Sequence, residues 1–272
     1  MNSAGRALST FLIAVMVVGV GGFVWAAFAR GLTWNDVTQF ALPRNGVIVA
    51  EQRYVVPEPT GDGSRLLPQV IVAEGGTYEM WYPGVDGDPV RYDPCEPVEW
   101  VYNPGSEPEG GAQIVADAVQ RVSDATGLLF VYEGETEEPL SDSRDAIQER
   151  YGVDRYAPVV IGWSDSGALA ALEGTVVGVG GSSVVPAAKG DGEYLAAGSV
   201  VIDVDDAQDL LDGFDGDAVL RAVIMHELAH VVGLAHVDDE AELMSPANRW
   251  KTEWGPGDRT ALALAGSGAC QS

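Results

Sequence analysis

Residues 226–236 read His-Glu-Leu-Ala-His-Val-Val-Gly-Leu-Ala-His, and this stretch decides how the rest of the chain is interpreted. His226 and His230 are four positions apart, so on an α-helix their imidazoles leave the same face one turn apart. Two ring nitrogens in that arrangement can bind one metal ion at about 2.0–2.1 Å. Gly233 is expected to end the helix in a left-handed conformation, which lets His236 return as a third ligand. The three histidines of the chain are therefore predicted to hold one catalytic zinc ion.

Glu227 follows the first histidine and is offset from it by about a hundred degrees around the helix. It is therefore predicted to lie beside the metal, as the general base that takes a proton from a zinc-activated water. Three protein ligands leave one coordination position open, which is typical of a catalytic zinc site. A lone His-Glu-x-x-His also occurs on ordinary surface helices. Here the helix has independent support, because Asp217 is a good N-cap for a helix that runs to about Val232.

The extended motif resembles that of the metzincin metalloproteases, and within them it is most similar to the matrixins. Met244, in Glu-Leu-Met-Ser-Pro at 242–246, fits the methionine turn that follows the motif in this group. The resemblance implies an apolar floor formed by Met244 under the zinc. It also implies a zincin-like α+β catalytic domain, and it spans roughly Asp93 to Cys270, with its specific residues at 226–246.

Two residues depart from the matrixin pattern, because Ser245 and Val237 stand where matrixins usually have Tyr and Ser. The resemblance to matrixins therefore does not assign the residues that form the wall of the specificity pocket in this chain. The resemblance implies that an extended substrate pairs with an edge strand near 176–180, so Val177, Gly178 and Val179 are predicted to bind substrate.

A twisted, mixed and mostly parallel sheet is predicted to pack on the active-site helix. Apolar residues between Ile114 and Ala125 recur at helical spacing, and Gly127 follows where a C-terminal glycine belongs. Pro256 is expected to begin a last short helix. The strands expected in this region are 98–102, 128–132, 159–161, 175–179 and 199–202.

Three segments are predicted along the chain: 1–30, 31–92 and 93–272. The stretch from Ala7 to Ala29 is apolar and uncharged, long enough to cross a bilayer as a helix. Ala-Phe-Ala at 27–29 resembles a signal-peptidase site, so a cleaved signal is the alternative to a membrane anchor. Either interpretation places the remainder outside the cytoplasm.

Residues 31–92 are rich in proline and glycine and are interpreted as a stalk or small β-rich preface. Residues 46–50 and 69–72 are its candidate strands. Residues 93–272 are assigned to the metalloprotease domain.

The formal net charge is −26, which makes nucleic acid an unfavourable partner. The predicted partners are protein or peptide substrates, and the lipid bilayer through the N-terminal segment. Asp238, Asp239, Glu240 and Glu242 flank the zinc motif and are interpreted as surface charge.

Cys95 and Cys270 are the two cysteines of the chain. In an oxidising compartment they are expected to form a disulfide. The alternative is two unrelated buried thiols.

The aspartates Asp203, Asp205, Asp206 and Asp209 follow a predicted strand. Calcium could bind there through carboxylate oxygens, but the spacing matches no calcium-binding loop. A solvated acidic loop is therefore the preferred interpretation, and calcium is left unsupported.

The predicted function is zinc-dependent hydrolysis of peptide bonds in extracytoplasmic proteins. The alternative is a zinc-binding cell-surface module without hydrolytic activity, against which the intact Glu227 argues. An intramembrane protease is rejected, because Asp217 and Arg221 stand within the predicted motif helix.

Overall fold

The computed structural model describes residues 44–84, 87–141, 143–246 and 251–271. Asn45–Ser272 form one compact unit. The predicted membrane or signal segment at 7–29 lies outside the described residues. Within the described ranges, no helix has both the length and the apolar character that crossing a membrane requires.

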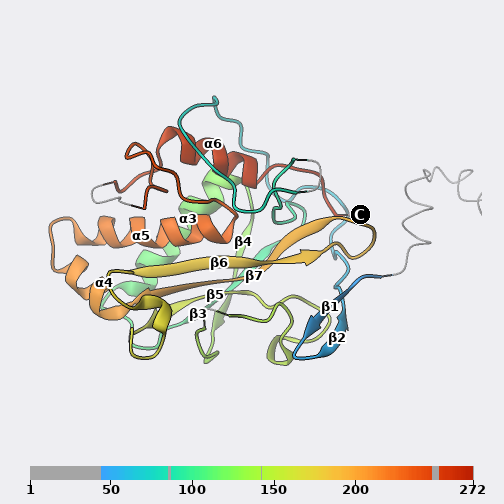
Figure 1. The fold of residues 1–272 in the computed structure, drawn as a ribbon, viewed down its shortest axis with the longest axis horizontal. Coiled ribbons are helices and arrows are strands. Elements are labelled where there is room, and N and C mark those ends of the chain that lie inside the picture. Colours follow the sequence, from blue (N-terminus) through green and yellow to red (C-terminus); the bar gives the residue numbers. More distant parts are fainter. Residues whose placement is uncertain (1–43, 85–86, 142, 247–250, 272) are drawn as a thin grey trace, which may run out of the picture. The chain divides into compact units, whose positions relative to one another are not determined.

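A five-stranded sheet forms the centre of this unit, with the order β4-β3-β5-β7-β6 (Figure 1). The first four strands in this order are parallel, and β6 runs antiparallel to β7. The strands are β3 (Val98–Asn103), β4 (Phe130–Glu135), β5 (Val159–Ser164), β6 (Gly178–Pro186) and β7 (Glu193–Asp203). The predicted mixed, mostly parallel sheet is confirmed, and β5 at its centre is buried along nearly its whole length, as expected when both faces are covered.

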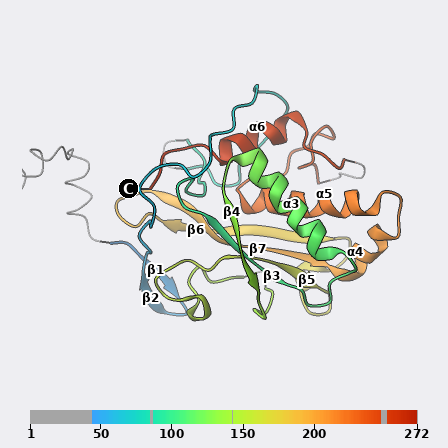
Figure 2. The same cartoon turned by 180° about the vertical axis from the view of Figure 1, so that it is seen from behind.

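Helices cover one face of the sheet, where α5 packs on β6 and β7 and α3 packs on α5 (Figures 1 and 2). The helices are α3 (Gly111–Thr126), α4 (Val204–Leu211), α5 (Gly216–Val231) and α6 (Pro256–Ala265), with short 3-10 helices η1 (Glu149–Tyr151) and η2 (Ala170–Leu172). The main core lies between α5, α3 and the sheet. A smaller cluster, which includes Ala157 and Ala196, covers the other face.

The helix that carries the zinc motif begins slightly earlier than predicted. Its N-cap position is occupied by Asp215, which has a φ of 55°, and Asp217 lies in the first turn. The predicted N-cap at Asp217 is therefore wrong by two residues. An acidic side chain in the first turn still interacts favourably with the helix dipole.

Two predicted strands are displaced in the structure. The strand expected at 128–132 begins at Phe130, because Leu128 lies in the turn that follows α3, where its N–H donates to Thr126 Oγ1 at 3.1 Å. The glycine-containing strand expected at 175–179 begins at Gly178 and is, as predicted, at the edge of the sheet. Gly127 ends α3 with a φ of 71°, as its position predicts.

Part of the predicted preface is a hairpin of β1 (Gly46–Val49) and β2 (Gln52–Val55). Residues 69–72 were expected to form a second strand, and this prediction is wrong. Ile71 is 89% exposed, so the β-branched residues there have no surface to cover. From Asn45 on, the preface belongs to the same compact unit as the rest of the described chain, and the boundary at 92/93 stays a prediction.

The aspartate cluster is the start of a helix, so its interpretation as a loop is wrong. Asp203 is the N-cap of α4, and its Oδ1 accepts N–H bonds from Asp205 and Asp206 at 2.9 and 3.1 Å. The cluster therefore has a structural explanation without calcium.

Cys95 and Cys270 form a disulfide with their Cα atoms 5.4 Å apart. Non-reducing peptide mapping is expected to recover one crosslinked pair of peptides. A crosslink that closes a loop of this length, a sequence separation of 175, stabilises the fold by up to about 5 kcal/mol in the chain-entropy model. Reduction should therefore lower the midpoint of urea unfolding. Recovery of two free, alkylatable thiols from the unreduced protein would contradict the pairing.

Candidate metal centre and active site

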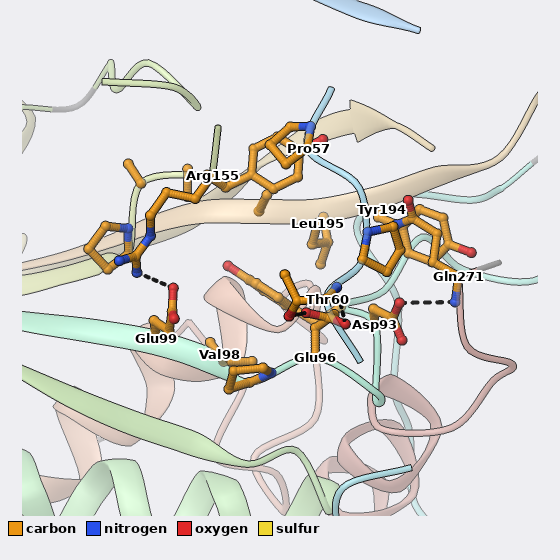
Figure 3. Close-up of a pocket in the computed structure, with 18 of the residues that line it drawn as sticks. Pro57, Thr60, Asp93, Glu96, Val98, Glu99, Arg155, Tyr194, Leu195 and Gln271 are labelled. Atoms are coloured by element: carbon orange, nitrogen blue, oxygen red, sulfur yellow. Dashed lines mark hydrogen bonds and ion pairs between the residues drawn. The ribbon is translucent and has the colours of Figure 1, made fainter. Parts of the chain in front are cut away.

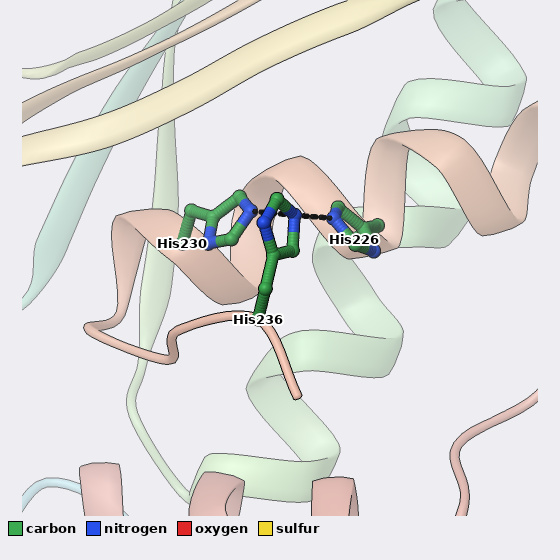
Figure 4. A group of neighbouring side chains, drawn as sticks. All are labelled: His226, His230 and His236. Carbon is green, nitrogen blue, oxygen red and sulfur yellow. Dashed lines mark hydrogen bonds between the residues drawn. The ribbon is translucent and has the colours of Figure 1, made fainter. Parts of the chain in front are cut away.

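The structure brings His226, His230 and His236 together at the end of α5 (Figure 4). The Nε2 atom of His236 lies 2.9 Å from that of His226 and 3.1 Å from that of His230. His226 and His230 come from adjacent turns of α5, whereas His236 comes from the following loop. The chain can turn back there because Gly233 adopts a φ of 99°.

Backbone carbonyls orient the first two imidazoles. His226 Nδ1 lies 2.8 Å from the carbonyl oxygen of Leu243, and His230 Nδ1 lies 2.8 Å from that of Leu234. A carbonyl only accepts hydrogen bonds, so each Nδ1 carries the proton and each Nε2 carries a lone pair. Three rings whose Nε2 atoms meet at one point, with two of those atoms unprotonated, fit a cation between them.

Burial keeps these histidines in the form that binds metal. It lowers the pKa of His226 to about 4 and that of His230 to about 3, and it also lowers the pKa of His236. The neighbouring imidazoles lower the first two further. At neutral pH the rings are neutral, as zinc ligation requires.

Glu227 lies on the side of α5 that faces the edge strand β6. A Cβ atom on Gly180 would lie 2.3 Å from the Glu227 carbonyl oxygen, and one on Gly178 would lie 3.0 Å from Glu227 Cγ. Glycine at both positions therefore lets the strand approach the helix at this residue. Burial raises the pKa of the Glu227 carboxyl to about 8, and a cation held by the histidines would favour its charged form.

The predicted substrate-binding residues lie at the beginning of β6. Gly178 and Val179 pair with Ile202 and Val201 of β7, and the Val177 carbonyl accepts the N–H of Asp203 at 2.8 Å. Beyond β6 no further strand is present in the described ranges, so its outer backbone edge is free to pair with a strand.

The predicted methionine turn lies close to the first histidine. Met244 is 1% exposed and belongs to the main core, and its carbonyl accepts the N–H of Val237 at 3.1 Å. The preceding residue, Leu243, orients His226 through its carbonyl. The turn is thus hydrogen-bonded both to the His226 ring and to the loop that carries His236.

Two buried carboxylates hold this turn, and sequence reasoning missed both. Asp258 accepts N–H bonds from Leu243, Met244 and Gly255 at 2.5, 3.2 and 2.8 Å. Glu242 was interpreted as surface charge, which is wrong: it is fully buried. The partners of Glu242 Oε2 are the N–H groups of residues 257 and 258, at 2.9 and 3.0 Å. One signal was present in the sequence, because an acidic residue two positions after Pro256 suits the N3 position of a helix start.

Asp258→Asn is expected to destabilise the protein by about 1–3 kcal/mol, because the amide NH2 group would face a buried N–H donor. Burial disfavours the charged form of Asp258 and raises its pKa. A neutral amide still cannot replace it, because an amide has one acceptor oxygen whereas the carboxylate uses both of its oxygens. Thermal unfolding should show a Tm lower by about 2–4 °C for each kcal/mol. The matched control is Asp124→Asn, at an exposed site on α3. Equal Tm values for the two variants would contradict this role.

A pocket of about 340 Å³ lies away from the histidines, with Pro57, Arg155 and Tyr194 among its lining residues (Figure 3). None of the predicted site residues lines it. Its carboxylate Glu99 is paired with Arg155, and Asp93 accepts the N–H of Gln271 at 2.9 Å. These two carboxylates are thus engaged in contacts within the fold.

Comparison with known proteins gives one family match. Residues 159–255 match the peptidase M10 family model, described as matrixin. No curated protein matches. Among solved structures, archaemetzincin from Methanopyrus kandleri is 20% identical, with a TM-score of 0.33 over 62% of this chain and 84% of that one. A GM1-bound ECX AB5 holotoxin is 11% identical, with a TM-score of 0.35 over 64% and 81%. Both TM-scores lie below 0.5.

Proposed function

We propose that this chain, whose residues 159–255 match the matrixin family model, is a zinc-dependent endopeptidase that cleaves extracytoplasmic proteins. The observation that carries the proposal is the meeting of three histidine Nε2 atoms next to Glu227 and the edge strand β6. This arrangement combines a metal site, a base and a surface for an extended peptide.

His226, His230 and His236 would hold the zinc ion, with their rings kept neutral and two of them oriented by backbone carbonyls. When bound, zinc supplies Lewis acidity, which polarises a peptide carbonyl and makes a water molecule more acidic. Glu227 then acts as general base: its carboxylate accepts a proton from the attacking water and passes it to the leaving amine. Glu227 is buried on the side of α5 that faces β6, along which an extended substrate would bind.

The substrate would bind as an additional strand along β6. The main-chain groups of Gly178 and Val179 lie at the sheet edge beside Glu227, which supports this mode of binding. Hydrogen bonds to the edge of β6 select an extended peptide conformation. The preference for particular substrate side chains depends instead on the residues that surround the cleft.

An extracytoplasmic location is part of the proposal. The Cys95–Cys270 disulfide supports it, because structural disulfides persist in oxidising compartments. The apolar segment at 7–29 supports export, either as an anchor or as a cleaved signal. N-terminal sequencing of the mature protein distinguishes these two forms.

The test of the proposed function is cleavage of quenched fluorescent peptides and casein by the purified full chain. Metal analysis should find one zinc ion per chain. A chelator should remove activity, and added zinc should restore it. A zinc-loaded, folded protein that cleaves none of these substrates would contradict the proposal and favour the non-hydrolytic module.

A further inference from the structure

A short segment of the predicted preface, residues 79–81, lies directly against the zinc-binding loop. The N–H of Trp81 donates to the Gly233 carbonyl at 2.8 Å, and the N–H of Ala235 donates to the Glu79 carbonyl at 2.9 Å. Met80 and Leu234 form an antiparallel bridge between these two bonds. Hydrogen bonds on both sides therefore fix the segment beside the loop that joins the second and third histidines.

Trp81 is placed against the metal centre itself. Its ring centroid lies 4.8 Å from that of His230, with an interplanar angle of 67°. Tyr82 stacks on it at 6.2 Å. The side chain nevertheless remains 47% exposed. A large aromatic surface is thus held open to solvent next to the candidate catalytic residues.

Glu79 and Trp81 flank Met80, one residue to each side along the segment. Met80 packs against the main core, whereas Glu79 and much of the Trp81 side chain are open to solvent. Glu79 is exposed, and the described structure gives its carboxylate no ion-pair partner. An indole and a carboxylate two residues apart in the chain are consequently both open to solvent beside the zinc-binding loop.

The geometry points to a subsite formed by Glu79 and Trp81 that binds a lysine or arginine side chain of the peptide substrate. The face of an indole attracts a cation, and the methylene stem of a basic side chain packs on aromatic carbon. The carboxylate adds a charge of opposite sign, and the net charge of −26 favours the approach of basic peptides. This inference rests on the proposed function, since it assigns the specificity of the same site.

The two histidines of α5 indicate on which side of the metal centre the subsite lies. Leu243, next to the predicted methionine turn, contacts the His226 end of the centre, whereas Trp81 contacts the His230 end. A peptide that crosses the centre along β6 would therefore place a residue from one side of its scissile bond on Trp81. The preference for a basic residue should appear on one side of the cleavage site only.

The test compares peptides that carry lysine, norleucine or glutamate at each position around a fixed scissile bond. Norleucine has a side chain of similar length without the charge. Cleavage by the full chain is measured as kcat/KM. Affinity is measured separately by fluorescence anisotropy with the zinc-loaded Glu227→Gln protein, so binding can be compared even if turnover is absent.

At one position, the lysine peptide is expected to exceed the norleucine peptide by about tenfold in kcat/KM and affinity, in the range of a partly desolvated cation–π contact. Trp81→Ala and Glu79→Gln should each reduce this ratio, and Trp81→Phe should retain part of it. The controls are Phe214→Ala, which removes a 98% exposed aromatic ring elsewhere, and Glu137→Gln, which removes an exposed charge. Both controls should keep the wild-type ratio.

A ratio near one at every position in wild type would overturn the inference, while cleavage of the peptides would leave the proposed function intact. An equal lysine preference in wild type, Trp81→Ala and Glu79→Gln would overturn it as well, because the preference would then arise elsewhere. If no peptide is cleaved but the affinity ratio depends on Trp81 and Glu79, the subsite stands and the proposed hydrolysis fails.

Discussion

Glu227→Gln is expected to lower kcat by about a hundredfold to ten-thousandfold, the usual contribution of a general base. The amide has nearly the same shape as the carboxylate but cannot accept the proton. The fold should be unaffected, because glutamine fills the same space against β6 and burying its neutral amide costs less than burying a charge. Zinc content should also be unchanged, since the three imidazoles meet without any contribution from Glu227.

The measurement combines kcat on a quenched peptide, zinc content and thermal unfolding. Glu240→Gln is the matched control, because it removes an exposed carboxylate close to the third histidine. That variant should retain kcat within a small factor. Turnover at the wild-type rate by a zinc-loaded Glu227→Gln protein would show that another group is the base.

The zinc-motif helix could be predicted because its signals are local. The four-residue spacing of His226 and His230 and the need for glycine at position 233 follow from backbone geometry alone. The helix α6 after Pro256 was predicted from a similarly local signal. These elements are found close to their predicted positions.

The carboxylates behind the methionine turn could not be predicted in the same way. Asp and Glu are rarely fully buried, so Glu242 in an acidic stretch is ordinarily interpreted as surface. Its burial depends on N–H groups fifteen and sixteen residues further along the chain. Such donors become visible only when the turn and the start of α6 are brought together.

Local β-propensity also gave a wrong prediction where pairing with a distant segment decides whether a strand forms. Residues 69–72 have the composition of a strand, but no neighbouring strand pairs with them in the described structure. Conversely, residues 79–81 have no strong local signal, yet backbone hydrogen bonds to the zinc-binding loop place Trp81 beside His230. The role of the predicted preface near the site was therefore hidden from sequence reasoning.

His236→Ala is expected to abolish stable zinc binding and peptidase activity together. The Nε2 atom of His236 lies within 3.1 Å of both other ligand atoms, so its removal takes one of three donors from the centre. Loss of a residue that merely orients a ligand typically costs about 10–100-fold in metal affinity, and loss of the ligand itself should cost more.

The same substitution should leave the helix α5 intact, which separates loss of metal from loss of fold. α5 ends at Val231, and His236 is an exposed residue of the following loop. Far-UV circular dichroism of the metal-free variant should therefore match that of metal-free wild type, while competition with a chelator reports the zinc affinity. Asp238→Ala, an exposed neighbour in the same loop, is the control and should bind zinc normally. An unchanged zinc affinity in His236→Ala would mean that the third ligand is another residue, and the arrangement proposed for the centre would be wrong.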